Sequence, residues 1–310
     1  MRIFFNEPSL NTGDSTAGGG LDKIAVIAEI RQTLTEVRDL PTLPTIVMEV
    51  MKLVSNPNSS VSEIVELLEE DLALTGKLLR TANSAYYGVP RKIDNLKMAL
   101  VIIGMDEVSN LITSSSVLKM FPSRPDSEGF DSAAFWRHSA ATAEITQGLY
   151  AGLRLPKNSG AYVAGLLHDI GKLVLNQYFH HYYLQCTDYA LEHSVTPARA
   201  EAEVIGVDHG HIGGWLAQRW NLPDEIINAI AQHHIRPADT PQYSFPEMLD
   251  WADRFYSLLN GRTPDRVIAM LMKNQEFLDW IGTRSIPLPN LVNDLFNRME
   301  RSLKLQEILK

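Results

Sequence analysis

The sequence is poor in the features that mark secreted, membrane-spanning or β-rich proteins. Its single cysteine, Cys186, excludes an intrachain disulfide and is typical of a reducing compartment. No segment approaches the roughly 20 consecutive apolar residues of a membrane-spanning helix, and residues 1–20 lack the apolar core of a secretory signal. Long alternating runs of β-branched residues are also missing. We therefore expect a cytoplasmic, all-α protein with no membrane partner.

Positive charge is also in short supply. The chain has 28 Lys and Arg residues against 37 Asp and Glu residues, which gives a formal net charge of −9. A net-acidic protein lacks the broad positive field that attracts the phosphate backbone of nucleic acids. The composition therefore disfavours a nucleic-acid partner, although a local basic patch stays open.

The hydrophobic pattern predicts an array of helices with few long interruptions. A length of 310 residues suits two packed helical subdomains. Residues 121–132 carry two prolines, a glycine and several polar residues, which is typical of a linker. The predicted parts are a flexible N-terminal arm (1–20), an N-terminal helical part (21–120), a second helical part (133–260) and C-terminal helices (261–310).

Some helix boundaries can be predicted from local chemistry. Ser60 and Glu63 have the spacing of a capping box, in which each side chain bonds the backbone of the other at a helix start. Gly104 is expected to end a helix over 95–103. Farther along, the apolar spacing predicts single continuous helices over 159–178, 197–220 and 263–282.

The histidines are concentrated in one part of the chain. All nine lie between His138 and His234, and histidine is the commonest metal ligand and proton shuttle near neutral pH. His168 and Asp169 stand within an apolar stripe that runs from Val163 to Val174, which predicts a helix anchored in the core.

A metal at this pair needs ligands from elsewhere in the chain. Neighbouring residues on a helix point about 100° apart, so His168 and Asp169 can share one ion only in a groove that other helices close. His138 and Asp253 are the candidates for the remaining ligands. Mixed imidazole and carboxylate ligation favours Mn, Fe, Zn or Ni over Ca. The alternative is that His168 and Asp169 form an internal hydrogen-bonded pair.

These motifs resemble those of the HD superfamily of metal-dependent phosphohydrolases, and more specifically its HDOD branch. The HD pattern of a first His, a His-Asp pair and a distal Asp matches His138, His168, Asp169 and Asp253. The segments similar to HDOD signatures, in chain order, are 40–44 (LPTLP), 71–79 (DLALTGKLL), 83–85 (NSA), 99–104 (ALVIIG), 208–216 (DHGHIGGWL), 220–223 (WNLP) and 233–234 (HH).

The resemblance implies an HD-like helical bundle preceded by an N-terminal helical subdomain. It also implies a regulatory module of bacterial signalling, whose partners are signalling proteins or a small phosphorylated ligand. His209, His233 and His234 stand where HD-GYP cyclic-dinucleotide phosphodiesterases have similar histidines, which makes them candidates for a second metal or for substrate. Ile235 stands where a Glu is expected, and no Gly-Tyr-Pro follows, which argues against cyclic-dinucleotide hydrolysis.

Two function hypotheses follow. In the first, the protein is a signal-transduction module with an HD-type metal site. In the second, a divalent metal at the four HD ligands serves the hydrolysis of a phosphoester or nucleotide. Lys172 is either a phosphate-binding cation or a solvated lysine. The remaining histidines (His180, His181, His193 and His211) are expected at the surface, and Cys186 is expected to be structural.

Overall fold

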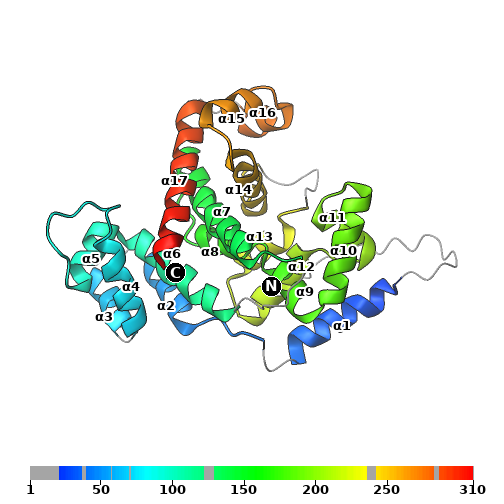
Figure 1. Cartoon of the computed structure of the whole chain (residues 1–310), viewed down its shortest axis with the longest axis horizontal. Coiled ribbons are helices and arrows are strands. Elements are labelled where there is room, and N and C mark those ends of the chain that lie inside the picture. The colour runs from blue at the N-terminus through cyan, green and yellow to red at the C-terminus, as the bar shows by residue number, and fades with distance from the viewer. Residues whose placement is uncertain are drawn as a thin grey trace.

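The structure is a computed structural model that describes residues 21–36, 40–56, 58–69, 71–121, 129–235, 242–282 and 286–309. Those ranges contain seventeen helices and no strand, so the all-α prediction is confirmed (Figure 1). The predicted arm over 1–20 and most of the predicted linker over 121–132 lie outside the described residues.

The first helices end and begin where local chemistry predicts. Ser60 and Glu63 form the expected capping box at the start of α3, with the Glu63 amide 3.3 Å from the Ser60 hydroxyl. Gly104, at φ 92°, ends α5 in a conformation that disfavours a side chain. The helices of this part are α1 (Lys23–Glu36), α2 (Thr45–Ser55), α3 (Val61–Glu69), α4 (Leu72–Ala82), α5 (Leu96–Ile103) and α6 (Met105–Met120).

Buried side chains of α2–α6 form one hydrophobic core, which we call the N-terminal core. Leu305, from the other end of the chain, is buried in it as well. The helix α1 packs elsewhere: Arg31 lies over the ring of Trp215 at 4.5 Å, and the Tyr182 hydroxyl bonds Glu29 at 3.0 Å. In space, α1 therefore belongs with the second half of the chain.

A second set of helices surrounds the histidines. With α1 and the end of α6 they bury the central core, whose members include Trp136, Leu166, Ile170, Ile212 and Ile230. The helices are α7 (Ser132–Gly152), α8 (Ala161–Leu167), α9 (Ile170–Tyr178), α10 (His180–His193), α11 (Pro197–Val204), α12 (His209–Arg219) and α13 (Asp224–Gln232).

The last four helices pack on the other face of α7 and form the C-terminal core, in which Ile145, Trp251, Phe277 and Leu295 are buried. In Figure 1, α17 runs from α15 across α7 and ends beside α6. Thus α6, α7 and α17 each contribute side chains to two of the three cores. These helices are α14 (Phe245–Leu259), α15 (Pro264–Leu271), α16 (Gln275–Ile281) and α17 (Leu288–Leu309).

Three predictions of continuous helices were wrong. The segment 159–178 divides into α8 and α9 at His168 and Asp169, 197–220 divides into α11 and α12, and 263–282 divides into α15 and α16. Two of the later helices have their own N-caps, because Asp208 accepts from the amide of His211 and Asn274 from that of Phe277. An apolar stripe that continues through such a cap hides the break.

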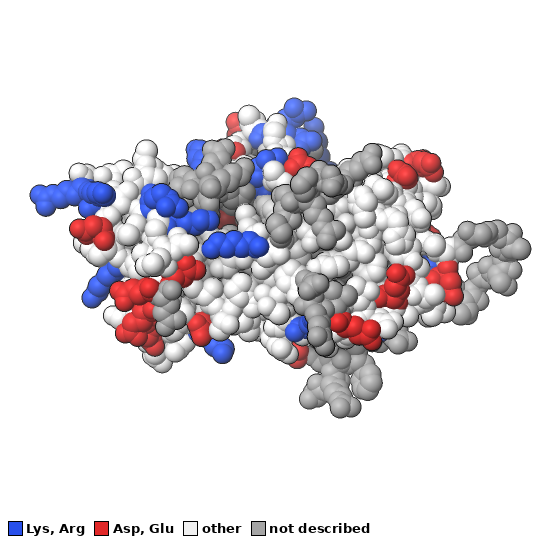
Figure 2. All heavy atoms as spheres, turned by 60° about the horizontal axis from the view of Figure 1, so that its bottom comes forward, with Lys and Arg blue, Asp and Glu red and all other residues white. Residues whose placement is uncertain are grey.

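The surface of the described residues carries charge of both signs. Figure 2 shows Lys and Arg side chains gathered over the end of the molecule that α3–α5 form, beside a group of Asp and Glu side chains. Elsewhere on that face the charged side chains stand in small separate groups. No helix in the described part of the chain combines the length and the apolar character needed to span a bilayer.

Candidate metal centre

Asp169 lies at the middle of the histidine-rich region, and its two carboxylate oxygens face different groups of side chains. Oδ2 lies 3.2 Å from His138 Nε2 and 3.4 Å from His168 Nε2. His138 Nε2 is also 3.2 Å from Asp253 Oδ1. The structure therefore brings together the four residues that the sequence pattern singled out, from α7, the α8–α9 junction and α14.

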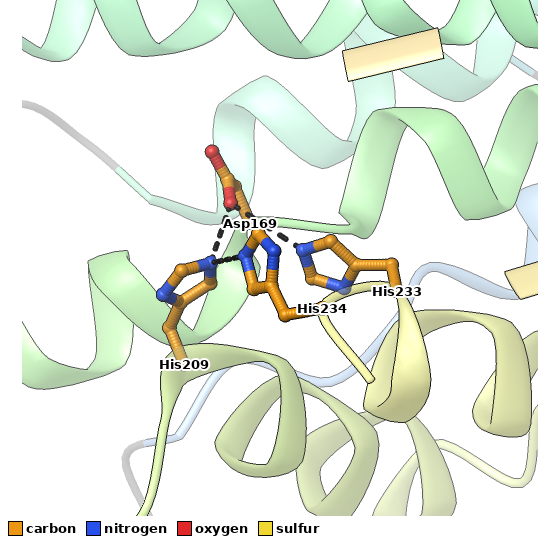
Figure 3. A group of neighbouring side chains, drawn as sticks. All are labelled: Asp169, His209, His233 and His234. Atoms are coloured by element: carbon orange, nitrogen blue, oxygen red, sulfur yellow. Dashed lines mark hydrogen bonds and ion pairs between the residues drawn. The ribbon is translucent and has the colours of Figure 1, made fainter. Parts of the chain in front are cut away.

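The other oxygen of Asp169 faces the second group of predicted residues, His209, His233 and His234 (Figure 3). Asp169 Oδ1 lies 2.9 Å from His209 Nε2 and 4.0 Å from His233 Nε2. His234 Nε2 lies 2.8 Å from His209 Nε2. All four side chains offer ligand atoms that lie within 4.8 Å of one another. The two groups thus adjoin, with Asp169 between them.

The break between α8 and α9 sets the direction of the central pair. His168 is the C-cap of α8 and keeps helical backbone angles, whereas Asp169 departs from them at φ −95° and ψ 6°. The expectation that both residues lie inside one continuous helix was therefore wrong. The close approach of α9 to α12 places His209 beside Asp169. The two helices are so close that a Cβ on Gly171 would overlap the carbonyl oxygen of His209.

Three of the buried histidines have their Nδ1 atoms engaged by acceptors. His168 Nδ1 donates to the Gly165 carbonyl at 2.8 Å, and His233 Nδ1 donates to the Ile230 carbonyl at 2.7 Å. A carbonyl oxygen can only accept, so the proton of each neutral ring is on Nδ1 and Nε2 presents a lone pair to the centre. This is the arrangement of a metal-ligating histidine held by a backbone acceptor.

Glu201 is the acceptor beside His209 Nδ1, and the sequence pattern did not predict this role. Its Oε2 accepts from the backbone amide of His209 at 2.6 Å and lies 2.7 Å from His209 Nδ1. Glu201 is 4% exposed, which is unusual for a carboxylate on a helix that carries several charged residues. Only the spatial approach of α11 to the start of α12 brings it to His209, so spacing in the sequence gives no signal.

The donor set fits a divalent cation. His233 Nε2 is buried without a hydrogen-bond partner among the described residues, and such an orphaned lone pair is costly unless something binds it. Burial, with His168 and His209 nearby, lowers the pKa of His233 to about 3. Burial also lowers the pKa of His168 and of His234. Neutral imidazoles with aimed lone pairs are what a metal ion requires.

The carboxylate at the centre stays ionised. Burial opposes the charge of Asp169, but His168, Lys172 and His209 together hold its pKa well below the usual range. For His209, burial opposes the imidazolium, yet the carboxylates of Glu201 and Asp169 outweigh it and raise its pKa to about 9. Without a metal, protein cations therefore balance the charge of Asp169.

Lys172, the candidate phosphate-binding residue, stands at the rim of this centre. Its Nζ lies 2.7 Å from Asp169 Oδ2, and this neighbour raises the pKa of Lys172 in spite of burial. Its side chain is 25% exposed, close to the 27% of Asp253 and the 17% of His138. His168 and Asp169 are almost fully buried. The centre is thus reached from the side of His138, Lys172 and Asp253.

The other histidines and the cysteine lie outside the two groups. His181 and His193 are exposed as expected, whereas His180 and His211 are half-buried and bond Asn176 and Asp208. Cys186 is buried in the central core, and burial raises the pKa of its thiol to about 12, which suits a structural side chain. Tyr256 was not anticipated: its ring packs edge-on against His138, with centroids 4.7 Å apart.

Comparison with known proteins places this geometry in a family context. The sequence model of the HDOD domain matches residues 40–236. An uncharacterised protein of Treponema pallidum (strain Nichols) is 29% identical over 236 residues, which are 74% of this chain and 44% of that protein. The chain therefore spans less than half the length of the curated relative that it matches.

Two crystal structures share the fold over nearly their whole length. An HDOD domain protein of unknown function from Geobacter sulfurreducens is 25% identical, with a TM-score of 0.74 that covers 93% of this chain and 99% of that one. A candidate phosphohydrolase from Shewanella amazonensis SB2B is 26% identical, with a TM-score of 0.71 that covers 91% and 98%. Both are similar to the present chain in their overall helical fold.

Proposed function

The chain belongs to the HDOD domain family, and from this membership we propose that it is a bacterial signal-transduction protein whose metal centre hydrolyses a phosphoester. The observation that carries the proposal is the convergence of six ligand-type side chains around the carboxylate of Asp169. The description of the Shewanella amazonensis relative as a candidate phosphohydrolase supports the same reading. The proposed partners are signalling proteins or a small phosphorylated ligand.

His138, His168, Asp169 and Asp253 would hold one divalent ion, and Asp169 with His209, His233 and His234 would hold a second. Nitrogen and oxygen ligands of this kind suit Fe, Mn, Zn or Ni. Such ions supply an acidified water and a positive charge that offsets the charge of the phosphoryl oxygens.

The chain's own residues would orient the substrate and limit its approach. His168 and His233 are fixed by their backbone acceptors, so they hold their Nε2 atoms in place without rearrangement. The buried side of the centre excludes a phosphoester, which must enter past Lys172 and Asp253. There the Lys172 ammonium would neutralise a phosphate oxygen.

A second function, regulation without hydrolysis, is favoured by one specific contact. Lys172 Nζ lies 2.7 Å from Asp169 Oδ2, and His209 Nε2 lies 2.9 Å from Asp169 Oδ1, so both oxygens have partners from the protein. A centre whose charge the protein itself balances can persist as a structural or sensory element without metal. This matches the regulatory use of the domain that the resemblance implies.

Metal analysis of the purified protein and a phosphoester screen separate the two functions. We expect stoichiometric metal and turnover of p-nitrophenyl phosphate, bis(p-nitrophenyl) phosphate or a cyclic dinucleotide, with turnover lost in Asp169→Ala. Metal without turnover of any of these would favour the regulatory function. A metal-free protein without turnover, after incubation with Mn²⁺, Fe²⁺, Zn²⁺ or Ni²⁺, would contradict the hydrolase.

A further inference from the structure

A polar cavity lies between α6, α7 and α17, where the N-terminal and C-terminal cores adjoin. Its volume is about 540 Å³, within the range of small-molecule sites. It shares no residue with the two groups of metal-ligand candidates. Glu144, on its wall, follows His138 by six residues on α7, which is about 9 Å along the helix axis. The cavity is thus separate from the Asp169 centre.

Buried charges of both signs line this cavity. Glu107 and Glu144 are only 8% and 4% exposed, and both come from helices that are otherwise packed in the cores. Arg301 forms an ion pair with Glu107, and Arg298 Nη1 lies 3.9 Å from Glu144 Oε2. At the rim, Lys157 pairs with Asp106 at 2.7 Å. Three carboxylates and three cations line the cavity, so its formal charge is zero.

The hydrogen bonds inside the cavity leave particular atoms without partners. Asn110 Nδ2 donates to Glu144 Oε1 and to Gln147 Oε1, each at 3.0 Å. The other oxygen, Glu144 Oε2, has Arg298 only at 3.9 Å, which is too long for a hydrogen bond. The Nε atom of Arg301 is buried with no hydrogen-bond partner in the part of the chain that is described. Among the described residues, Glu144 Oε2 and the buried Arg301 Nε, both on the wall of the cavity, therefore lack a hydrogen-bond partner.

Groups of this kind are costly when they stay unpaired. A buried guanidinium nitrogen without an acceptor is destabilising, and burial of the Glu144 carboxyl raises its pKa. Burial and the nearby Glu144 raise the pKa of Glu107 to about 7, in spite of Arg301. A ligand with an N–H donor for Glu144 and an acidic group for Arg301 would satisfy both sides at once.

We propose that this α6–α7–α17 cavity binds a small zwitterion of the α-amino-acid class. The ligand's ammonium would bond Glu144 Oε2, and its carboxylate would bond Arg301. The apolar residues Ile103, Tyr150 and Leu155, which also line the cavity, would contact its side chain. Carboxylates and cations lie side by side in the cavity, which matches the two opposite charges of a zwitterion better than the single sign of a phosphorylated ligand.

The proposal is tested by thermal unfolding of the full chain with each common L-amino acid, followed by calorimetric titration of those that stabilise it. We expect saturable binding of at least one amino acid, because a ligand that binds only the folded state raises its unfolding midpoint. AMP and GMP serve as phosphorylated comparison ligands of similar or larger size. Binding of the nucleotides but of no amino acid would overturn the proposal, as would the absence of any binding.

Variants locate the site. Arg301→Met and Glu144→Gln should each weaken amino-acid binding by about ten- to a hundredfold, because each removes a charged hydrogen-bond partner. Lys304→Gln and Glu300→Gln change the same charges elsewhere on α17 and should leave binding unchanged. If Glu144→Gln fails to fold, Gln147→Met changes the same wall of the cavity while it keeps both ion pairs, and it should weaken amino-acid binding in its place. Unchanged affinity in Arg301→Met would contradict the proposal.

Discussion

Asp169 is the residue on which the candidate metal centre depends most. Its Oδ2 faces His138 and its Oδ1 faces His209, so the loss of this one carboxylate removes a ligand from both groups. Each histidine, by contrast, belongs to one group only. The two halves of the centre can therefore be removed separately.

We expect Asp169→Asn to abolish binding of both ions, whereas His138→Gln and His209→Gln each reduce the content from two ions per chain to one. The physical reason is that a divalent ion needs several protein ligands, and each histidine variant leaves the other group complete. Elemental analysis after dialysis measures the metal per chain. His193→Gln, at an exposed position, is the matched control and should retain both ions. Loss of both ions in His138→Gln would show that the two groups act as one site.

Glu107 gives the protein a pH dependence that is independent of the metal centre. Burial and Glu144 raise its pKa to about 7, so the folded state prefers the protonated form. Stability from this group is present below the unfolded pKa near 4.5 and is lost as the pH rises through 7.

Glu107→Gln mimics the protonated form, and its stability relative to the native protein should rise by about 1–3 kcal/mol between pH 4.5 and pH 7. Urea unfolding at several pH values measures this difference. The break of the Arg301 pair adds an offset that changes little over this range, so the slope rather than the offset is diagnostic. A control at an exposed position, Glu192→Gln, should show no such slope. A difference that is flat across the range would contradict the assigned pKa.

At the level of single residues, the sequence predicted more of the candidate metal centre than of the polar cavity. His138, His168, Asp169 and Asp253 are brought together as the motif implied, because histidine is rare enough for its clustering to be informative. Glu107, Glu144 and Arg301 gave no such signal, since charged residues on amphipathic helices usually face solvent. Their burial depends on the contact of α17 with α6 and α7, which no local pattern encodes.

The packing of α9 on α12 is the element-level feature that positions His209. The two helices are close enough that a Cβ on Gly171 would overlap the carbonyl oxygen of His209 and lie 2.8 Å from its carbonyl carbon. Both atoms belong to the backbone, so the strain cannot be relieved by a side-chain rotation. Only a glycine permits this approach.

Gly171→Ala should therefore destabilise the fold by about 3 kcal/mol and weaken metal binding by the His209 group. Thermal unfolding and metal content measure the two effects. Gly76→Ala is a suitable control, because Gly76 lies inside α4 and its added Cβ would meet only the end of Arg80 at 3.6 Å. There the better helix propensity of alanine should stabilise the protein by about 0.5–1 kcal/mol. Equal behaviour of the two variants would contradict the packing argument.

Helix existence was predictable, but helix continuity was not. The capping box at Ser60 and the stop at Gly104 were predicted because their chemistry is local. The break at His168 and Asp169 was missed because the apolar stripe continues across it, and the junction is fixed by packing against α7 and α12. Breaks that depend on tertiary contacts leave little trace in periodicity.

The three hydrophobic cores are joined by helices that contribute buried side chains to two of them, namely α6, α7, α14 and α17. Leu305 of α17 is the one residue of the C-terminal helices that is buried in the N-terminal core among the described side chains. All five tryptophans lie in, or pack against, the central and C-terminal cores. Tryptophan fluorescence therefore reports on those two cores, whereas circular dichroism reports on every helix.

For the native chain we expect fluorescence and circular dichroism to change together during urea unfolding, as in a single cooperative unit. Leu305→Ala should cost about 2–5 kcal/mol and separate the two signals, because it weakens only the attachment of the N-terminal core. Helical signal from α2–α6 should then be lost at lower urea than the fluorescence change. Leu271→Ala, an equally buried leucine of the C-terminal core, is the control and should shift both signals together. An equal shift of both signals in Leu305→Ala would show that α17 does not control the coupling of the N-terminal core to the other two cores. The N-terminal core would then be held by α6 and its contacts with α2 and α8.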